Sequence, residues 1–175
     1  MKRSLVLGLI GALLEIIAMA SIDRPVAAYI SGAEIQSTLT RLPAVHFDRA
    51  LRVVDVGGAH VGFAMIRRPQ GWMECNWARL DQVTEVMRIV SGDGTFVTGG
   101  ELKEPQAVTS ADADSKLMGV GAVGADIVGG DAQHLGSGDV VIIPAGVPHG
   151  FRTIDSDAVV LELVRVDTGK VLALK

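Results

Sequence analysis

One histidine of this chain follows a strand and a rigid turn, a position from which a side chain can do chemistry. The segment reads Gly138-Asp-Val-Val-Ile-Ile-Pro-Ala-Gly-Val-Pro-His149. Its β-branched residues from Val140 to Ile143 favour an extended, packed backbone. Pro144 ends the strand because proline has no amide hydrogen to give to a sheet. The turn therefore presents His149 from the edge of a β-scaffold, as a metal ligand or as a proton carrier.

Glu85 is the second candidate, within a run predicted to form a strand over Val83 to Val90. By the two-residue alternation of strands it shares a face with Met87 and Ile89. A carboxylate on an apolar face must be paired, protonated or bound to something. Two interpretations follow. Glu85 is a metal ligand or a general acid/base with a raised pKa, or it forms a structural ion pair with an inward arginine.

The two segments together resemble the motifs of the cupin superfamily. Gly138 to His149 fits the second cupin motif, G-x5-P-x-G-x2-H, and Glu85 to Gly92 fits the latter half of the first, E-x6-G. The resemblance covers about residues 50–167 and looks like exported single-domain cupins of bacteria. It implies an antiparallel jelly-roll barrel that takes a small molecule inside, with isomerase, lyase or dioxygenase chemistry.

The first motif is degenerate in this chain. In the family it normally begins H-x-H, but here the corresponding stretch from Ala78 to Thr84 contains no histidine. Cupin metal sites typically use three histidines and one glutamate. The resemblance therefore carries over only Glu85 and His149, as ligands of one divalent ion (Fe, Mn, Ni or Zn) or as an acid/base pair. Two clear ligands predict low metal affinity, because such sites depend on ligand number and geometry.

Other residues are candidates to complete a metal site. Gln82 and Asp81 offer oxygen ligands, which favour harder or borderline cations. His60 begins a predicted strand and becomes a ligand if the barrel folds it inward, although a histidine beside a turn more often has no such role. His46 and His134 lie in predicted loops and are weaker candidates.

Both tryptophans lie in Trp72-Met-Glu-Cys-Asn-Trp77, just before the degenerate motif. One interpretation is an aromatic lid at the mouth of a ligand pocket that Met87 and Phe151 also line. The other is plain packing of two large side chains onto the barrel. Nothing nearby lowers the pKa of the Cys75 thiol, so packing is favoured for Cys75.

Composition excludes several classes of protein. The chain has 175 residues, which suits one domain. Its net charge is −4 and no basic patch occurs, so the sequence gives no sign of nucleic-acid binding. A single cysteine excludes an intramolecular disulfide and a cysteine-based zinc motif.

The N-terminal residues have the pattern of an export signal. Lys2 and Arg3 precede the apolar run from Leu5 to Leu14, and Ala18-Met-Ala20 forms an A-x-A cleavage site. A membrane anchor is the main alternative, but Glu15 interrupts a run already short for a bilayer span. We expect a signal peptide over residues 1–20, with cleavage there or near residue 28. The domain then spans residues 29–175 of a periplasmic or secreted protein without a membrane span.

The remaining pattern predicts an all-β fold. Ser31 and Glu34 form a capping box, which predicts a helix over residues 32–41. Short β-rich runs with Gly and Pro turns follow, which is typical of a barrel. The predicted strands are 51–56, 61–67, 83–90, 95–98, one within 127–135, 139–143, 149–154 and 158–166, and 101–117 is predicted to be a surface loop.

Two hypotheses on function follow. The first is a small-molecule enzyme that uses the barrel interior, with isomerase- or lyase-like chemistry at Glu85 and His149. The second is a non-catalytic periplasmic binding protein whose metal site has decayed. Edge strands of such barrels often pair between subunits, so a homodimer is expected.

Overall fold

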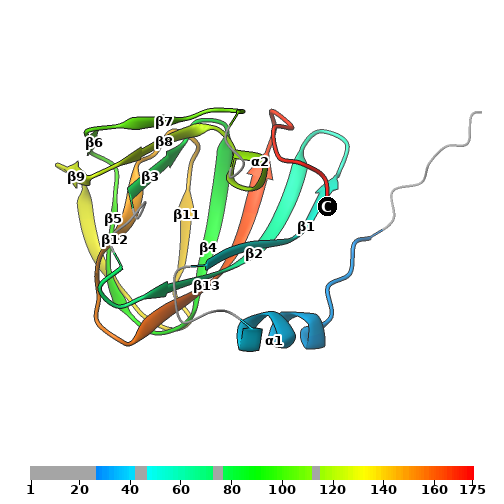
Figure 1. Ribbon diagram of the computed structural model, residues 1–175, viewed down its shortest axis with the longest axis horizontal. Helices are drawn as coiled ribbons and strands as arrows, with labels where there is room; N and C mark the ends of the chain where they lie inside the picture. The colour runs from blue at the N-terminus through cyan, green and yellow to red at the C-terminus, as the bar shows by residue number, and fades with distance from the viewer. Residues whose placement is uncertain (1–26, 42–46, 73–76, 112–114) are drawn as a thin grey trace, which may run out of the picture.

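The computed structural model describes residues 27–41, 47–72, 77–111 and 115–175, which begin with a short helix, α1 (Gly32–Arg41) (Figure 1). The Ser31 hydroxyl accepts a hydrogen bond from the Glu34 amide at 3.0 Å, which satisfies one of the free N–H groups of the first turn. The Glu34 carboxylate then pairs with Arg52 at 2.9 Å. The predicted helix is confirmed, and its start is tied to the first strand.

The strands form two main antiparallel sheets. Sheet A contains, in spatial order, β1 (Phe47–Asp55), β2 (His60–Pro69), β13 (Ala158–Asp167), β4 (Val83–Ser91) and β11 (Val140–Ile143). Sheet B contains β10 (Asp131–Leu135), β5 (Gly94–Thr98), β12 (His149–Ile154), β3 (Trp77–Leu80), β8 (Gly121–Gly124) and β7 (Gln106–Val108). A small ribbon of β6 (Glu101–Lys103) and β9 (Asp126–Val128) and the helix α2 (Ser115–Met118) complete the described elements.

The strand pairings give a jelly roll. In sheet A, β4 lies between β11 and β13. The chain then turns into sheet B, where β5 lies between β10 and β12. Along the chain β4 is followed by β5, β10 by β11 and β12 by β13. The three neighbouring strands β11, β4 and β13 of sheet A are therefore continued in sheet B by the three neighbouring strands β10, β5 and β12. The predicted all-β antiparallel barrel is confirmed.

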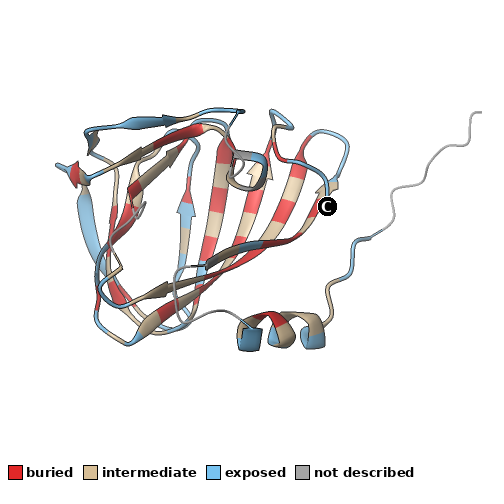
Figure 2. Ribbon diagram, viewed as in Figure 1, coloured by how far each residue is buried: buried red, intermediate tan, exposed pale blue. Residues whose placement is uncertain are grey.

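The core lies between the two sheets and follows strand alternation. Buried residues recur at every second position of β13, and Figure 2 shows the resulting stripes. Phe96 and Phe151 from sheet B meet at a ring separation of 4.9 Å in an edge-to-face arrangement, which is a favourable aromatic geometry. They pack against Met87 and Leu163 from sheet A. This apolar cluster supports the charged residues described below.

Most predicted strands occur to within a few residues, but the predicted loop over 101–117 is wrong. It contains β6, β7 and the first residues of α2, and β3 and β8 lie outside every predicted strand. These elements are three or four residues long and polar or glycine-rich, so they lack the periodicity that marks a strand. The expected signal peptide, Cys75 and His46 lie outside the described residues. Among the described helices, none is long and apolar enough to cross a membrane.

Candidate functional site

Glu85 and His149 meet inside the barrel, one from each sheet. His149 is the first residue of β12, and its Nε2 lies 3.1 Å from Oε2 of Glu85 on β4. The turn before it is fixed by Gly146, which has a φ of 84° and donates to the Leu80 carbonyl at 2.7 Å. Only glycine adopts that backbone readily. The Pro-Ala-Gly-Val-Pro turn thus positions His149 as the sequence predicts.

Two further charged residues continue the contact and were not among the predicted site residues. Arg165 on β13 donates from Nε to Glu85 Oε1 at 2.9 Å, and its terminal nitrogen donates to Asp48 on β1 at 3.1 Å. The result is a row of alternating charge, Asp48–Arg165–Glu85–His149, which we call the charge row. Arg165 is only 3% exposed. The structure therefore shows Glu85 as the partner of an inward arginine, which is the second of the two interpretations given above.

The hydrogen bonds of His149 identify its protonation. Its Nδ1 lies 3.0 Å from the Val147 carbonyl, which can only accept. Its Nε2 faces the Glu85 carboxylate, which also accepts when ionised. Both hydrogen bonds form together only when both ring nitrogens carry hydrogen, so this geometry favours the imidazolium form of His149. The charge row is then neutral in sum, as a buried group of charges requires.

Opposing effects set the pKa of Glu85. Burial acts to raise it, because a desolvated carboxylate resists ionisation. The positive charge of Arg165 and the hydrogen bond and charge of His149 outweigh burial and lower the pKa of Glu85 to about 2. Glu85 is therefore a permanent carboxylate near neutral pH. These surroundings lower the pKa of Glu85, whereas a role as general acid/base was expected to come with a raised pKa.

The same balance acts on the two cations of the row. Burial alone would lower the pKa of His149, but the Glu85 hydrogen bond and charge and the Val147 carbonyl raise it above its usual 6.5. Burial also opposes ionisation of Arg165, and the charges of Asp48 and Glu85 overcome it, so its pKa is raised. The shifts thus all favour the charged forms of Glu85, His149 and Arg165.

These directions predict how stability depends on pH. Glu85 stabilises the fold fully above its unfolded pKa of 4.5 and loses this effect as pH falls toward 2. His149 stabilises fully below its unfolded pKa of 6.5 and loses this effect as pH rises through its raised folded pKa. Urea denaturation should therefore show that the advantage of the wild type over His149→Gln shrinks above pH 6.5. An advantage that grows with alkaline pH would contradict the imidazolium assignment.

The donor set does not fit the divalent metal that the cupin resemblance implies. Ala78 is the direct cross-strand partner of His149, and Leu80 shares its face by alternation. Both positions at which the family has the histidines of H-x-H are therefore apolar in this chain, and both lie on the face beside His149. His149 contacts Oε2 of Glu85, and the other carboxylate oxygen, Oε1, accepts a hydrogen bond from the Arg165 cation. Two ligands with a guanidinium beside them do not make a site for Fe, Mn, Ni or Zn.

The other predicted ligands lie elsewhere. His60 is buried and does fold inward, but its Nδ1 lies 2.9 Å from the Leu172 carbonyl and its Nε2 lies 3.7 Å from Asp55. Asp81 is exposed and pairs with Arg79 at 2.8 Å. Gln82 is exposed in the turn after β3, with its side-chain oxygen beside Gly169. The structure therefore shows these residues with partners other than the charge row.

The predicted pocket residues separate into two groups. Met87 and Phe151 are both in the buried core, and Phe151 also lines a small cavity of about 170 Å³ with Trp72 and Arg152. Trp77 is 2% exposed and packs with Val97 and Ile127 in a separate cluster. Trp77 therefore packs in a second cluster of the core, whereas Trp72 lies at a cavity.

A second group of possible metal ligands lies on the surface. His134 on β10 is flanked by Asp93 and Asp155, each with an oxygen 3.6 Å from one ring nitrogen. All three side chains are more than two fifths exposed. In the sequence His134 is a weaker candidate because it lies in a predicted loop, and its two carboxylate partners come from turns that are distant along the chain. The two carboxylates approach opposite ring nitrogens, which is the geometry of exposed ion pairs as much as of a metal group.

No family model and no curated protein matches the chain. Solved structures do resemble it. A protein of Bacillus halodurans has 14% sequence identity, with 84% of each chain covered and a TM-score of 0.46. An RmlC-like cupin family protein with a double-stranded β-helix fold, from Methanocaldococcus jannaschii, has 13% identity, with 73% of this chain and 85% of that chain covered and a TM-score of 0.44. An oxalate oxidase has 14% identity, with 74% of this chain and 54% of that chain covered and a TM-score of 0.44.

Proposed function

We propose that this chain is an exported, non-catalytic protein that binds a small molecule, in a barrel whose metal centre is replaced by a permanent ion-pair row. One observation supports it above the others. Both carboxylate oxygens of Glu85 and both ring nitrogens of His149 already have partners within the protein, and Arg165 supplies the cation. A substrate could therefore reach either group only by displacing a partner that it already has within the protein. The export signal of the N-terminal sequence supports a periplasmic or secreted location.

The cavity beside Trp72 supports binding. It is lined by Trp72, Phe151 and Arg152 among others, and pockets of mixed apolar and polar lining suit small ligands. Arg68 stacks over the Trp72 ring at 4.8 Å, which holds the indole in place. A compact molecule with a planar apolar part and a negative group is the class that matches these side chains.

Metal-independent proton transfer is the second candidate, because one observation favours it. The His149 side chain is 13% exposed, so its ring is within reach of a small molecule. A substrate that displaced the Val147 carbonyl or Glu85 from one ring nitrogen would meet an imidazolium, which is a proton donor. Glu85 would orient the ring and stabilise its charge, which is the part that a carboxylate beside a histidine ordinarily takes.

Thermal denaturation separates these functions. The purified protein should keep its midpoint after dialysis against EDTA and gain nothing from added Mn²⁺, Ni²⁺ or Zn²⁺, because no divalent metal contributes to its fold. A panel of small aromatic carboxylates should include compounds that raise the midpoint, and Trp72→Ala should remove that shift while His149→Gln keeps it. Loss of stability with EDTA would overturn the metal-free proposal. Turnover of a bound compound that His149→Gln abolishes would favour proton transfer instead.

A further inference from the structure

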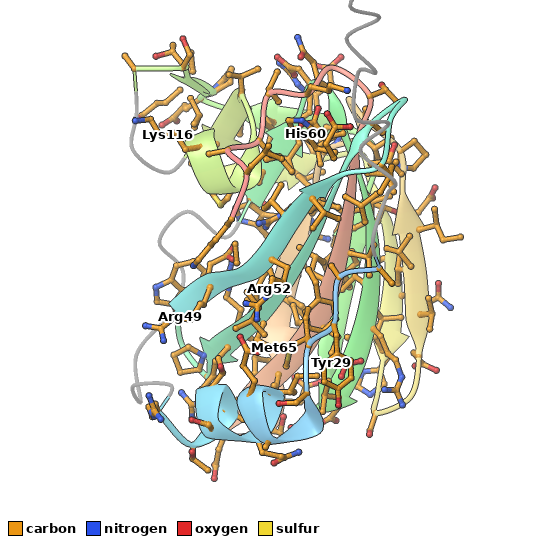
Figure 3. The ribbon with its side chains drawn as sticks, turned by 90° about the vertical axis from the view of Figure 1, so that its right-hand side faces the viewer. Tyr29, Arg49, Arg52, His60, Met65 and Lys116 are labelled. Atoms are coloured by element: carbon orange, nitrogen blue, oxygen red, sulfur yellow. The ribbon has the colours of Figure 1, made fainter. Side chains whose placement is uncertain are left out.

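One buried carboxylate of the barrel lies outside the charge row. Asp167 is the last residue of β13 and is 0% exposed. Strand pairing places it beside His60 on β2 and Val83 on β4. Figure 3 labels His60 at this end of the barrel, which lies away from α1. A carboxylate that is removed from water needs hydrogen-bond donors or a cation to replace its hydration.

The two carboxylate oxygens of Asp167 differ in their surroundings. Oδ2 accepts a hydrogen bond from the Leu172 amide at 2.8 Å. Oδ1 is buried and has no hydrogen-bond partner among the described residues. Within the same residues the ion-pair partner of Asp167 is His60, whose Nδ1 lies 4.0 Å from Oδ2, a distance too long for a hydrogen bond. Asp167 is therefore a buried acid with one oxygen unpartnered.

The hydrogen bonds of His60 do not give it the charge that would balance Asp167. Its Nδ1 lies 2.9 Å from the Leu172 carbonyl, which can only accept. Its Nε2 lies 3.7 Å from Asp55, whose carboxylate already pairs with Lys170 at 2.8 Å. One acceptor within hydrogen-bond distance requires only one ring hydrogen, so this geometry favours a neutral imidazole. The negative charge of Asp167 then has no counter-charge among the described side chains around it.

A second oxygen lies beside the same place, on the turn between β3 and β4. A methyl group added to Gly169 would lie 2.6 Å from Oε1 of Gln82 and 3.6 Å from Oδ1 of Asp167. The spot beside the Gly169 α-carbon is therefore bordered by two oxygens that accept hydrogen bonds. Carboxylate and amide oxygens are ligands of hard cations rather than of soft metals. The pair of oxygens thus has the chemistry of a small cation site.

We propose that Gln82 and Asp167 bind one monovalent cation of the Na⁺ class beside Gly169. One buried carboxylate requires one positive charge, since the charge of Asp55 is already balanced by Lys170. Oε1 of Gln82 and Oδ1 of Asp167 are the protein ligands, and water completes the coordination from the exposed side of Gln82. The ion joins the turn after β13 to the turn before β4. This site is separate from the charge row and does not depend on the proposed small-molecule function.

Thermal denaturation in matched salts tests the site. The wild type should unfold at least about 3 °C higher in about 150 mM NaCl than in tetramethylammonium chloride of equal ionic strength, because an ion that binds only the folded chain stabilises it. Gly169→Ala fills the spot between the oxygens and Gln82→Met removes one of them, so both variants should lose this difference. Gln82→Glu adds a second carboxylate and should lower the Na⁺ concentration for half the effect by about 10-fold.

Two controls keep the test independent of folding. Gly169 does not have a positive φ, and the closest atom to the added methyl group is the end of the exposed Gln82 side chain. Gly169→Ala should therefore keep the native circular dichroism spectrum. Asp81→Asn changes an exposed acid next to Gln82 that pairs with Arg79, and this variant should keep the Na⁺ effect. EDTA does not remove Na⁺, so a response to EDTA reports on a different metal.

Three results would overturn the proposal. The first is a wild type with the same midpoint in both salts, or a Na⁺ effect that Gly169→Ala retains. The second is a Gln82→Glu variant that is destabilised equally in both salts, because the amide nitrogen of Gln82 would then be the donor to Asp167. The third is stabilisation by Ca²⁺ but not by Na⁺, which would contradict a site of single charge.

Discussion

Arg165→Met should cost about 3–5 kcal/mol of folding free energy, the range found when one partner of a buried ion pair is removed. Arg165 is the central cation of the charge row and contacts two carboxylates, those of Asp48 and Glu85. Methionine keeps the apolar stem but removes the cation of the row that pairs with Asp48 and leaves Glu85 with His149 alone. Their burial then raises the free energy of the folded state, because desolvated carboxylates lose hydration without a replacement. Urea denaturation near pH 6 measures the loss.

An exposed ion pair supplies the matched control. Arg79→Met removes a partner of Asp81 in a pair that is more than a third exposed, so it should change stability by no more than about 1 kcal/mol. The double variant Arg165→Met/Glu85→Met should lose less than the sum of its two single variants, because it removes a repelled carboxylate together with its cation. Strict additivity would show that Arg165 and Glu85 do not depend on each other.

The sequence predicts the fold well where its signals are local. β-branched runs, alternation and proline–glycine turns are properties of neighbouring residues, and they locate β4, β11, β12 and β13. The same alternation places Glu85 and His149 on inward faces, and the turn before His149 has the predicted form. The short strands β3 and β8 are stabilised by their neighbours in sheet B rather than by their own residues, so tertiary context decides them.

The partners within the site are harder to predict because barrel closure brings them together. Asp48, Glu85, His149 and Arg165 come from four strands and both sheets. A signal was present for Arg165, since it continues the inward series of Leu161 and Leu163 on β13. No comparable signal marks Asp48, which lies before the predicted first strand. Sequence alone could therefore suggest an inward arginine as the partner of Glu85, but it could not predict that Asp48 and His149 complete the charge row.

Glu85→Ala should remove the counter-ion of two cations at once, with an expected cost of about 3–5 kcal/mol. Arg165 keeps Asp48, but His149 loses the group whose hydrogen bond and charge raise its pKa. Burial and the nearby Arg165 charge both oppose the imidazolium, so the pKa of His149 should fall and its ring should become neutral near pH 7. Long-range proton–nitrogen NMR of the imidazole reports this change directly.

Two comparisons separate charge from packing in that result. Glu85→Gln keeps the size of the side chain and an oxygen toward His149, so it should lower the pKa of His149 as Glu85→Ala does but cost less stability. Glu101→Ala removes an exposed carboxylate from β6 and should change neither quantity. If His149 remained an imidazolium near pH 8 in Glu85→Ala, another acceptor would be holding its proton, and Glu85 would not be the group that keeps His149 charged.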